Sequence, residues 1–237
     1  MKKPFQSAAL AAVILPLTVG VSEAVVIANY DFTAYSLTNS VGVTPGVTVS
    51  DFSVGNYGDL TDNGASDNLR LSGDDNTDNS TGAAFTNGNF LSFSVTVADG
   101  YTMDLNTLSI DTQVTNAFQY SNARIYTSIQ GFDDVVDDTI AQIGVSSGGG
   151  FQALTTNIID FNGDSYLGSN ISDADFNGLT DTTVTFYIPW VDNSGSDTRY
   201  SDVDNVSLDA TVTVIPEPSS AMLLGLGGLA LVLRRKK

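Results

Sequence analysis

Histidine and cysteine are both absent from this chain of 237 residues. Their absence excludes Ser-His-Asp and Cys-His catalysis, imidazole and thiolate zinc sites, iron–sulfur clusters and disulfide bonds. Cations are also scarce, with nine Lys and Arg against 27 Asp and Glu and a formal net charge of −18. Because an acidic surface repels the phosphate backbone, we expect no nucleic-acid binding.

Residues 25–213 contain no glutamate and no lysine. Their 25 aspartates stand against three arginines (Arg70, Arg124 and Arg199), which gives this region a net charge of −22. The region is poor in helix formers and rich in Thr, Val, Ser, Asn, Asp and Gly, a composition typical of strands and turns. Two interpretations of the acidity remain open: it serves bound Ca²⁺ or a basic partner, or it only keeps a secreted protein soluble.

Hydrophobic and polar residues alternate with a period of two, which predicts half-buried strands. The alternation is clearest over residues 91–97, 183–190 and 206–214. Six further segments are predicted to be strands: 25–32, 47–54, 69–72, 107–113, 123–130 and 154–161. Short strands without a long helix predict an all-β fold, a single antiparallel β-sandwich over residues 25–213. A jelly roll is the preferred topology, and an immunoglobulin-like sandwich is the alternative.

Residues 1–24 have the three parts of a secretory signal peptide. Lys2 and Lys3 make a basic start, residues 8–21 are apolar, and Ser22-Glu23-Ala24 places small residues at the −3 and −1 positions of a cleavage site. We therefore expect the secretion machinery to export the chain and cleavage to follow Ala24. An uncleaved N-terminal anchor is the less favoured alternative, because the apolar segment is short.

Residues 214–237 combine a stiff Pro216-Glu217-Pro218, an apolar run over residues 221–233, and four terminal cations. An apolar helix of this length spans roughly 20 Å, against a hydrocarbon core of about 30 Å. The run therefore predicts a short transmembrane helix. The terminal cations place the C-terminus in the cytoplasm and the rest of the chain across the membrane.

These three parts, in this order, resemble the bacterial PEP-CTERM sorting signal. The resemblance implies that exosortase, a membrane protease-transpeptidase, removes the tail near Pro216, Glu217 and Pro218. It also implies that the protein is anchored in the membrane only transiently and then delivered to the cell surface or the extracellular polysaccharide matrix. An ordinary tail anchor that is never removed is the alternative.

Residues 25–213 are similar to the lectin-like and carbohydrate-binding-module jelly rolls, a type of domain found with this tail. The similarity depends on short motifs at residues 30–32 (Tyr-Asp-Phe), 100–111, 130–132, 176–179, 184–187 and 199–208. Gln130 departs from the Asp that such domains have in the same turn. The resemblance implies a sandwich with a binding role and no established activity.

Calcium is the cofactor that the aspartates favour, since hard cations take clustered oxygen ligands. In jelly rolls of this kind a structural Ca²⁺ often ties the first strand to the last, so the resemblance implies Asp31 and Asp204 as ligands. The alternative is that Asp204 and Asn205 only hydrogen-bond the backbone where the last strand starts. Three loops resemble the first half of an EF-hand loop but lack its later carboxylate, so polar turns are favoured there: residues 74–78, 160–164 and 173–178.

Exposed aromatic side chains would favour sugar binding, because aromatic rings stack on sugar faces. Tyr187, Trp190 and Tyr200 form a candidate ligand-binding rim near the end of one predicted strand. Trp190 falls on the same face as Val184 and Phe186, so packing in the core is the favoured alternative for this residue.

The sequence thus predicts a secreted surface or matrix protein that is not an enzyme and whose leading role is matrix or glycan binding. A purely structural surface protein is the alternative. A carboxylate-based enzyme acting on glycans is a third hypothesis, because two suitably placed aspartates can hydrolyse a glycosidic bond.

Overall fold

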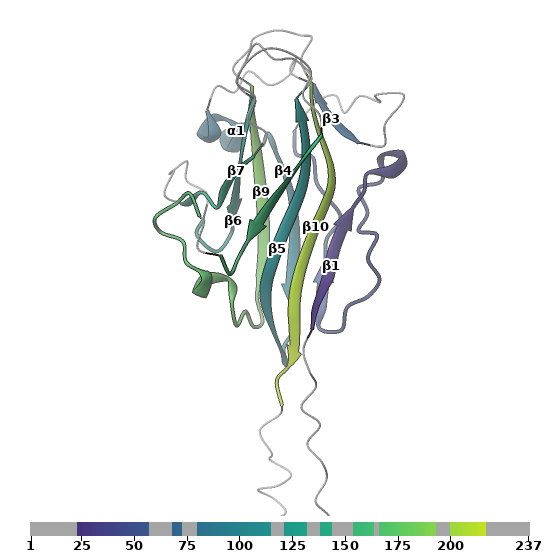
Figure 1. Cartoon of the computed structure of the whole chain (residues 1–237), viewed down its shortest axis with the longest axis vertical. Coiled ribbons are helices and arrows are strands. Elements are labelled where there is room, and N and C mark those ends of the chain that lie inside the picture. Colours follow the sequence, from purple (N-terminus) through teal and green to yellow (C-terminus); the bar gives the residue numbers. More distant parts are fainter. Residues whose placement is uncertain are drawn as a thin grey trace, which may run out of the picture.

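The structure is a computed structural model that describes residues 23–56, 68–72, 80–114, 121–131, 138–143, 154–163, 166–192 and 200–216. Ten strands in these residues form two five-stranded antiparallel sheets. The two sheets lie face to face as the layers of a sandwich (Figure 1). This architecture confirms the predicted all-β antiparallel sandwich.

The front sheet consists of five strands, and the long strand β10 is one of them. Its members are β1 (Ala24–Tyr30), β3 (Leu69–Ser72), β5 (Tyr101–Val114), β8 (Thr155–Asp160) and β10 (Tyr200–Val214). Strand β10 pairs with β5 along one side and with β3 and then β1 along the other. The first and last strands of the described chain are therefore neighbours in one sheet.

The back sheet has the order β2-β4-β9-β6-β7. Its members are β2 (Val47–Val49), β4 (Phe90–Val97), β6 (Ser121–Thr127), β7 (Ala141–Ile143) and β9 (Thr183–Asp192). The chain changes sheet at most connections, so both layers draw on all parts of the sequence.

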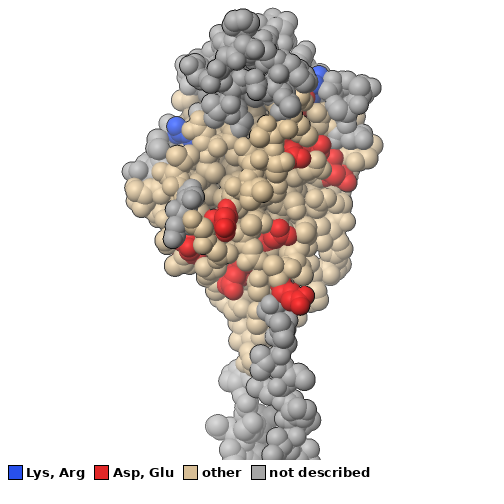
Figure 2. Space-filling model, in the orientation of Figure 1, with Lys and Arg blue, Asp and Glu red and all other residues tan. Residues whose placement is uncertain are grey.

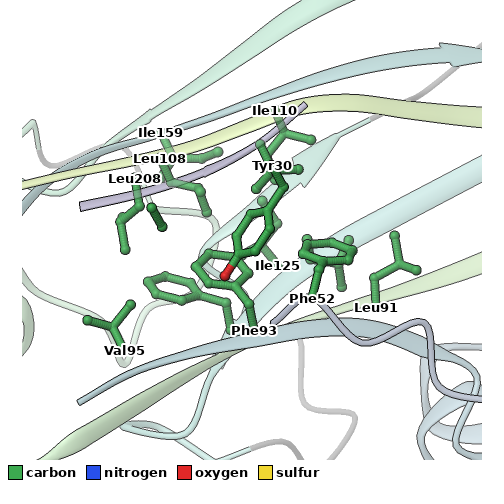
Figure 3. Packing of buried hydrophobic residues seen from close by; sticks show 14 of the residues in the cluster. Tyr30, Phe52, Leu91, Phe93, Val95, Leu108, Ile110, Ile125, Ile159 and Leu208 are labelled. Carbon is green, nitrogen blue, oxygen red and sulfur yellow. The ribbon is translucent and has the colours of Figure 1, made fainter. Parts of the chain in front are cut away.

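The core lies between the sheets and consists of the residues that the alternation places inward. In β4 and β9 the alternate apolar side chains are buried, as predicted: Leu91, Phe93, Val95, Val97, Val184, Phe186 and Ile188. In β10 the prediction is correct for Val206, Leu208 and Ala210, whereas Val212 is half-buried and Val214 is 61% exposed where the strand ends. Tyr30 projects from the front sheet into the core (Figure 3), where its ring lies 5.1 Å from that of Phe52 and 5.4 Å from that of Phe93. Its hydroxyl donates a 2.6 Å hydrogen bond to the carbonyl oxygen of Ser50.

Two β-bulges explain why the strands predicted at residues 107–113 and 206–214 are shorter than β5 and β10 in the structure. Strand β5 has an extra residue, Asn106, opposite the step from Asp209 to Ala210, so Leu105 and Leu108 both face the core. Strand β10 has an extra residue where Asp204 and Ser207 flank the shift, and Val203 and Val206 are both buried. A bulge shifts the period of two, so alternation followed from one side stops at the bulge.

Three short helices have their bounds in the described part of the chain: η1 (Thr33–Tyr35), α1 (Thr81–Asn87) and η3 (Asp173–Phe176). The period-two pattern did not predict α1, although its end signals are in the sequence: the Ser80 hydroxyl accepts the N–H of Ala83, and Gly88 ends the helix at φ 74°. No helix in the described part of the chain is long and apolar enough to cross a membrane. The segment predicted to do so, residues 221–233, lies outside the described residues.

One buried ion pair joins β3 to β10 at the outer face of the front sheet. Arg70 and Asp202 are register partners, and the guanidinium donates from Nε to Oδ1 at 2.7 Å and from Nη2 to Oδ2 at 2.8 Å. The Asp202 side chain is fully buried, while 15% of the Arg70 side chain is exposed. The bidentate geometry gives each carboxylate oxygen a hydrogen bond from the guanidinium, which offsets the desolvation cost of burying the charge.

We expect the loss of either partner of this pair to destabilise the fold strongly. Asp202→Asn or Arg70→Met should each lower the free energy of unfolding by about 3 kcal/mol, because the remaining charge is left without its partner. The double variant Arg70→Met/Asp202→Leu should lose much less than the sum of the two. Urea denaturation measures the free energy of unfolding of all three variants. Arg124→Met is the control, since Arg124 forms no ion pair with a described residue. If the double variant lost as much stability as the two single variants together, the prediction would be contradicted.

Alkaline pH should destabilise the sandwich through Tyr30. Burial, and secondly the negative charge of Asp51, raise the pKa of Tyr30 well above its ordinary value of 10.0. The folded state therefore keeps the proton that the unfolded state loses above about pH 10, and stability falls there by about 1.4 kcal/mol per pH unit. Tyr30→Phe should remove this slope in denaturation series from pH 9 to 11. Tyr35→Phe, an exposed control, should keep it, and equal slopes in wild type and Tyr30→Phe would refute the assignment.

Candidate functional site

Both ends of the described chain lie at one pole of the sandwich (Figure 1). Strand β1 starts at Ala24, which lies opposite Thr211 near the end of β10. Strand β10 ends at Val214, and the N–H of Ile215 donates a 2.8 Å hydrogen bond to the carbonyl oxygen of Gly100. The predicted sorting segment thus follows the last strand without a spacer.

The structure describes two of the residues predicted to take part in processing, Ala24 for signal cleavage and Pro216 for removal of the tail. Ala24 is the exposed first residue of β1, so cleavage after it would keep the pairing of Val25 with Ala210. Pro216 is exposed and is the last described residue, while Glu217 and Pro218 lie outside the described residues.

The structure brings Asp204 together with Asp111 on the neighbouring strand. Asp204 and Asp111 are register partners on β10 and β5, and the side-chain amide of Asn205 donates to Oδ2 of Asp111 at 2.9 Å and to Oδ2 of Asp204 at 3.2 Å. Oδ1 of Asp204 also accepts the N–H of Asn205 at 2.8 Å. The Asn205 side-chain amide therefore bridges the two carboxylates. The bond from the Asn205 backbone N–H to Asp204 fits the alternative prediction, in which Asp204 hydrogen-bonds the backbone.

Asp31 lies just past the end of β1, where Tyr30 is opposite Val206. Its Oδ1 accepts the N–H of Thr33 at 3.1 Å and so stabilises the turn that leads into η1. The described residues contain no group of three or more acidic side chains arranged to hold a metal ion. Calcium at Asp31 and Asp204 stays a prediction.

The two described EF-hand-like segments use their aspartates to stabilise turns. In η3, Asp175 accepts from the N–H of Ser172 at 2.8 Å and from its hydroxyl at 3.1 Å, which forms a capping box. Asp160 accepts the N–H of Asn162 at 2.9 Å. The polar-turn interpretation fits both segments; residues 74–78 lie outside the described residues.

The outer face of the front sheet is acidic but dispersed. Five aspartates project from it: Asp104, Asp111, Asp160, Asp204 and Asp209. Asp111 lies opposite Asp204, and Asp160 and Asp209 both lie opposite Thr107 of β5. Figure 2 shows some acidic residues next to one another and others surrounded by uncharged residues, with cations at the margin of this face. Apart from the pair of Asp111 and Asp204, this arrangement suits a solvated surface, because no three carboxylates of the described residues are arranged to hold a metal ion.

The structure separates two of the three predicted rim residues, Tyr187 and Trp190. Trp190 is only 2% exposed and belongs to the hydrophobic core, so its ring has no open face for a sugar. Trp190 is therefore corrected from a rim position to a core position, in agreement with the alternation of β9. Tyr187 is half-buried on the opposite face of β9. Tyr200 is the first residue of β10, and its side chain lies outside what the structure describes.

Tyr187 belongs to an aromatic patch, made of Phe85, Phe90, Tyr126 and Tyr187, on the outer face of the back sheet. The Phe85 ring of α1 lies 5.2 Å from that of Tyr126 and 6.3 Å from that of Tyr187. Phe90 lies 5.6 Å from Phe85 and 5.5 Å from Tyr187, nearly perpendicular to the latter. Tyr126 is buried, while the other three rings are half-buried and reach solvent.

Sequence reasoning missed the patch except for Tyr187. Its other members come from three separate segments, β4, β6 and α1, and only the pairing of β9 with β4 and β6 brings them together. The one sequence signal that could have indicated the patch was the pair of caps that predicts α1. A helix that packs on a sheet covers an apolar surface, so a predicted α1 would have implied apolar residues beneath it.

Comparison with known proteins identifies the tail. Residues 214–236 match the PEP-CTERM protein-sorting motif. No curated protein matches the chain significantly. Among solved structures, the chain is similar to the K1 cleaved adhesin domain of Lys-gingipain from Porphyromonas gingivalis W83, with 12% identity and a TM-score of 0.34 over 80% of this chain and 98% of that domain. A likeness this weak carries no argument about function.

The matched motif implies that the protein is processed by exosortase. It also implies secretion, transient anchoring in the membrane and sorting to the cell surface. The motif starts at Val214, which is also the last residue of β10, so the sorting signal and the folded sandwich meet at one residue.

We expect the mature protein from its native cell to lack residues 223–237. Replacing Pro216, Glu217 and Pro218 by alanine should leave the precursor in the membrane fraction, because the enzyme that removes the tail would lose its recognition element. Mass spectrometry of the C-terminal peptide and fractionation of the cells measure both effects. A double substitution inside the sandwich, Thr96→Ala/Thr183→Ala, is the control. An intact basic terminus on most surface molecules, or normal processing of the triple variant, would contradict the prediction.

Proposed function

We propose that the sandwich is a non-catalytic module that binds glycans of the extracellular matrix after exosortase has delivered it to the cell surface. The observation that supports this role is the aromatic patch. Half-buried Phe85, Phe90 and Tyr187 present ring surface to solvent, and aromatic rings combine a large contact area with little conformational entropy to lose on binding. Sugar rings have apolar faces that stack on such surfaces.

The patch is rigidly supported. Tyr187 and Phe90 lie on paired strands of the back sheet, with Phe90 opposite Pro189. Phe85 is fixed by α1, whose two ends are capped by Ser80 and Gly88. Side chains held by regular elements and by one another keep their binding geometry before the ligand arrives, which reduces the entropy cost of association.

The position of the patch fits delivery by the tail. Helix α1 lies toward the end of the sandwich that is far from the pole where β1 starts and β10 ends (Figure 1). A protein held through residues after Val214 would therefore present α1 and its neighbouring rings away from the membrane. The acidic front sheet would keep such a display soluble and would repel anionic surfaces.

Binding to polysaccharide extracted from the native matrix tests the proposal with the full-length protein in detergent. Tyr187→Ala should weaken binding at least tenfold, about 1.4 kcal/mol, because an aromatic anchor near the centre of an interface carries a large share of the binding energy. Tyr187→Phe should bind nearly as well as wild type, since it keeps the ring.

Tyr35→Ala is the matched control, because Tyr35 is a 39% exposed tyrosine in η1, outside the aromatic patch. It should leave binding unchanged, and thermal unfolding should show that all variants are folded. If wild type does not bind the polysaccharide, or if Tyr187→Ala and Tyr35→Ala bind alike, the protein is better described as a purely structural surface protein.

A further inference from the structure

The two sheets of the sandwich differ in charge. The front sheet has five aspartates on its outer face and a sixth, Asp202, in the ion pair with Arg70. The strands of the back sheet contain a single aspartate, Asp192 at the end of β9, and a single cation, Arg124 of β6. Helix α1, which packs against β9, has no charged residue. The acidic residues of the described strands are therefore concentrated on the front sheet, away from the aromatic patch.

Arg124 lies on the outer face of the back sheet, which is also the face of the aromatic patch. Its neighbours along β6, Ala123 and Ile125, are fully buried members of the core, so the alternation of the strand turns Arg124 outward. The arginine is half-buried and forms neither an ion pair nor a hydrogen bond with a described residue. A guanidinium that has lost part of its water without gaining a partner favours the binding of an anion.

The register of the back sheet sets Arg124 next to the patch. The pairing of β6 with β9 has the same register on both sides of Arg124, so no residue is inserted there. Arg124 is therefore opposite Pro189, and Tyr187 is its diagonal neighbour on the same face of the sheet. Such diagonal neighbours lie about 7–8 Å apart, within reach of long and aromatic side chains. Phe90 of β4 is opposite Pro189 on the other side of β9.

An arginine beside aromatic rings suits one class of sugar. A guanidinium binds a carboxylate through two parallel, charge-assisted hydrogen bonds, which neutral hydroxyl groups cannot replace. A uronic acid has an apolar ring face that can stack on Tyr187 or Phe90, and a carboxylate at the edge of the same ring. Because this carboxylate is attached directly to the sugar ring, it stays close to the stacked face and can meet an arginine on the neighbouring strand.

We infer that the ligand of the aromatic patch is an acidic polysaccharide whose sugar residues carry carboxylates, and that Arg124 selects their charge. The inference rests on the proposed function, since it specifies which glycan the patch binds. Sulfate esters are a second source of negative charge on sugars. They place that charge on a longer arm outside the sugar ring, so a sulfated polysaccharide serves as a comparison in the experiment.

The net charge of −22 over residues 25–213 is compatible with an acidic ligand on this face. The five outward aspartates of the front sheet are separated from the patch by the thickness of the sandwich, in which stacked sheets pack about 10 Å apart. The Debye length in physiological salt is about 8 Å, so most of their repulsion is screened at that distance. An acidic polysaccharide is therefore repelled from the front sheet and bound by the back sheet.

Binding of the full-length protein in detergent to two polymers tests the inference: polygalacturonate, and the same polymer after its carboxylates have been reduced to alcohols. Wild type should bind polygalacturonate at least about tenfold more tightly, because a charge-assisted pair adds to ring stacking. Arg124→Met should lose this preference and bind the reduced polymer as wild type does, since it keeps the rings of the patch. Added salt should weaken polygalacturonate binding by wild type more than by Arg124→Met, because salt screens the ion pair.

Two further variants separate the geometry of Arg124 from net charge. Arg124→Lys should recover only part of the preference, because an ammonium group cannot form the bidentate pair. Val43→Asp is the matched control, since it lowers the net charge by the same single unit as Arg124→Met at a position that is 97% exposed, outside the aromatic patch. It should keep the preference of wild type, and thermal unfolding should show that all variants are folded.

The inference is overturned if wild type binds the two polymers equally, or if Arg124→Met retains the preference. It is also overturned if wild type binds dextran sulfate more tightly than polygalacturonate, because negative charge alone would then account for binding.

Tyr187→Ala distinguishes failure of the inference from failure of the proposed function. If this variant loses binding to the matrix polysaccharide while Arg124→Met changes nothing, glycan binding at the patch stands and the preference for carboxylates is wrong. If Tyr187→Ala binds the matrix polysaccharide like wild type, the proposed function itself fails.

Discussion

The pairing of β10 with its neighbours is the constraint on which the rest of this structure depends. With no disulfide available, the sandwich is held by burial and by sheet hydrogen bonds, and β10 is hydrogen-bonded on both sides, by β5 and by β3 and β1. The buried pair of Arg70 and Asp202 lies at one end of this strand, and the tail follows the other end at Val214. A change that loosens β10 therefore affects the core, the first strand and the attachment of the sorting signal together.

This arrangement makes the two poles of the sandwich different. Because Ala24 is opposite Thr211 and β10 ends at Val214, the two ends of the described chain lie at one pole, and α1 with its aromatic neighbours lies toward the other. The N–H of Ile215 donates to the carbonyl oxygen of Gly100, so the hydrogen bonding of the sandwich extends into the matched sorting motif, which starts at Val214. Strand order therefore decides which pole of the sandwich carries the motif.

The aspartates illustrate how one residue type serves different purposes in one fold. Asp202 is neutralised by Arg70, Asp175 caps a helix, and Asp204 with Asp111 accepts from the Asn205 amide. Sequence spacing predicts clustered oxygens but not their partners, since a turn, a cap and a metal loop all favour Asp and Asn.

The sequence by itself determined the fold class, the buried faces of β4 and β9, and the sorting motif at residues 214–236, because these depend on local periodicity or on a contiguous pattern. The alternation also favoured the core position of Trp190. Tertiary structure alone decided the true lengths of β5 and β10, since bulges at Asn106 and near Asn205 shift the period where the partner strand requires it. It also decided the aromatic patch, because contacts between strands that are distant in sequence depend on pairing and register, which no local pattern specifies.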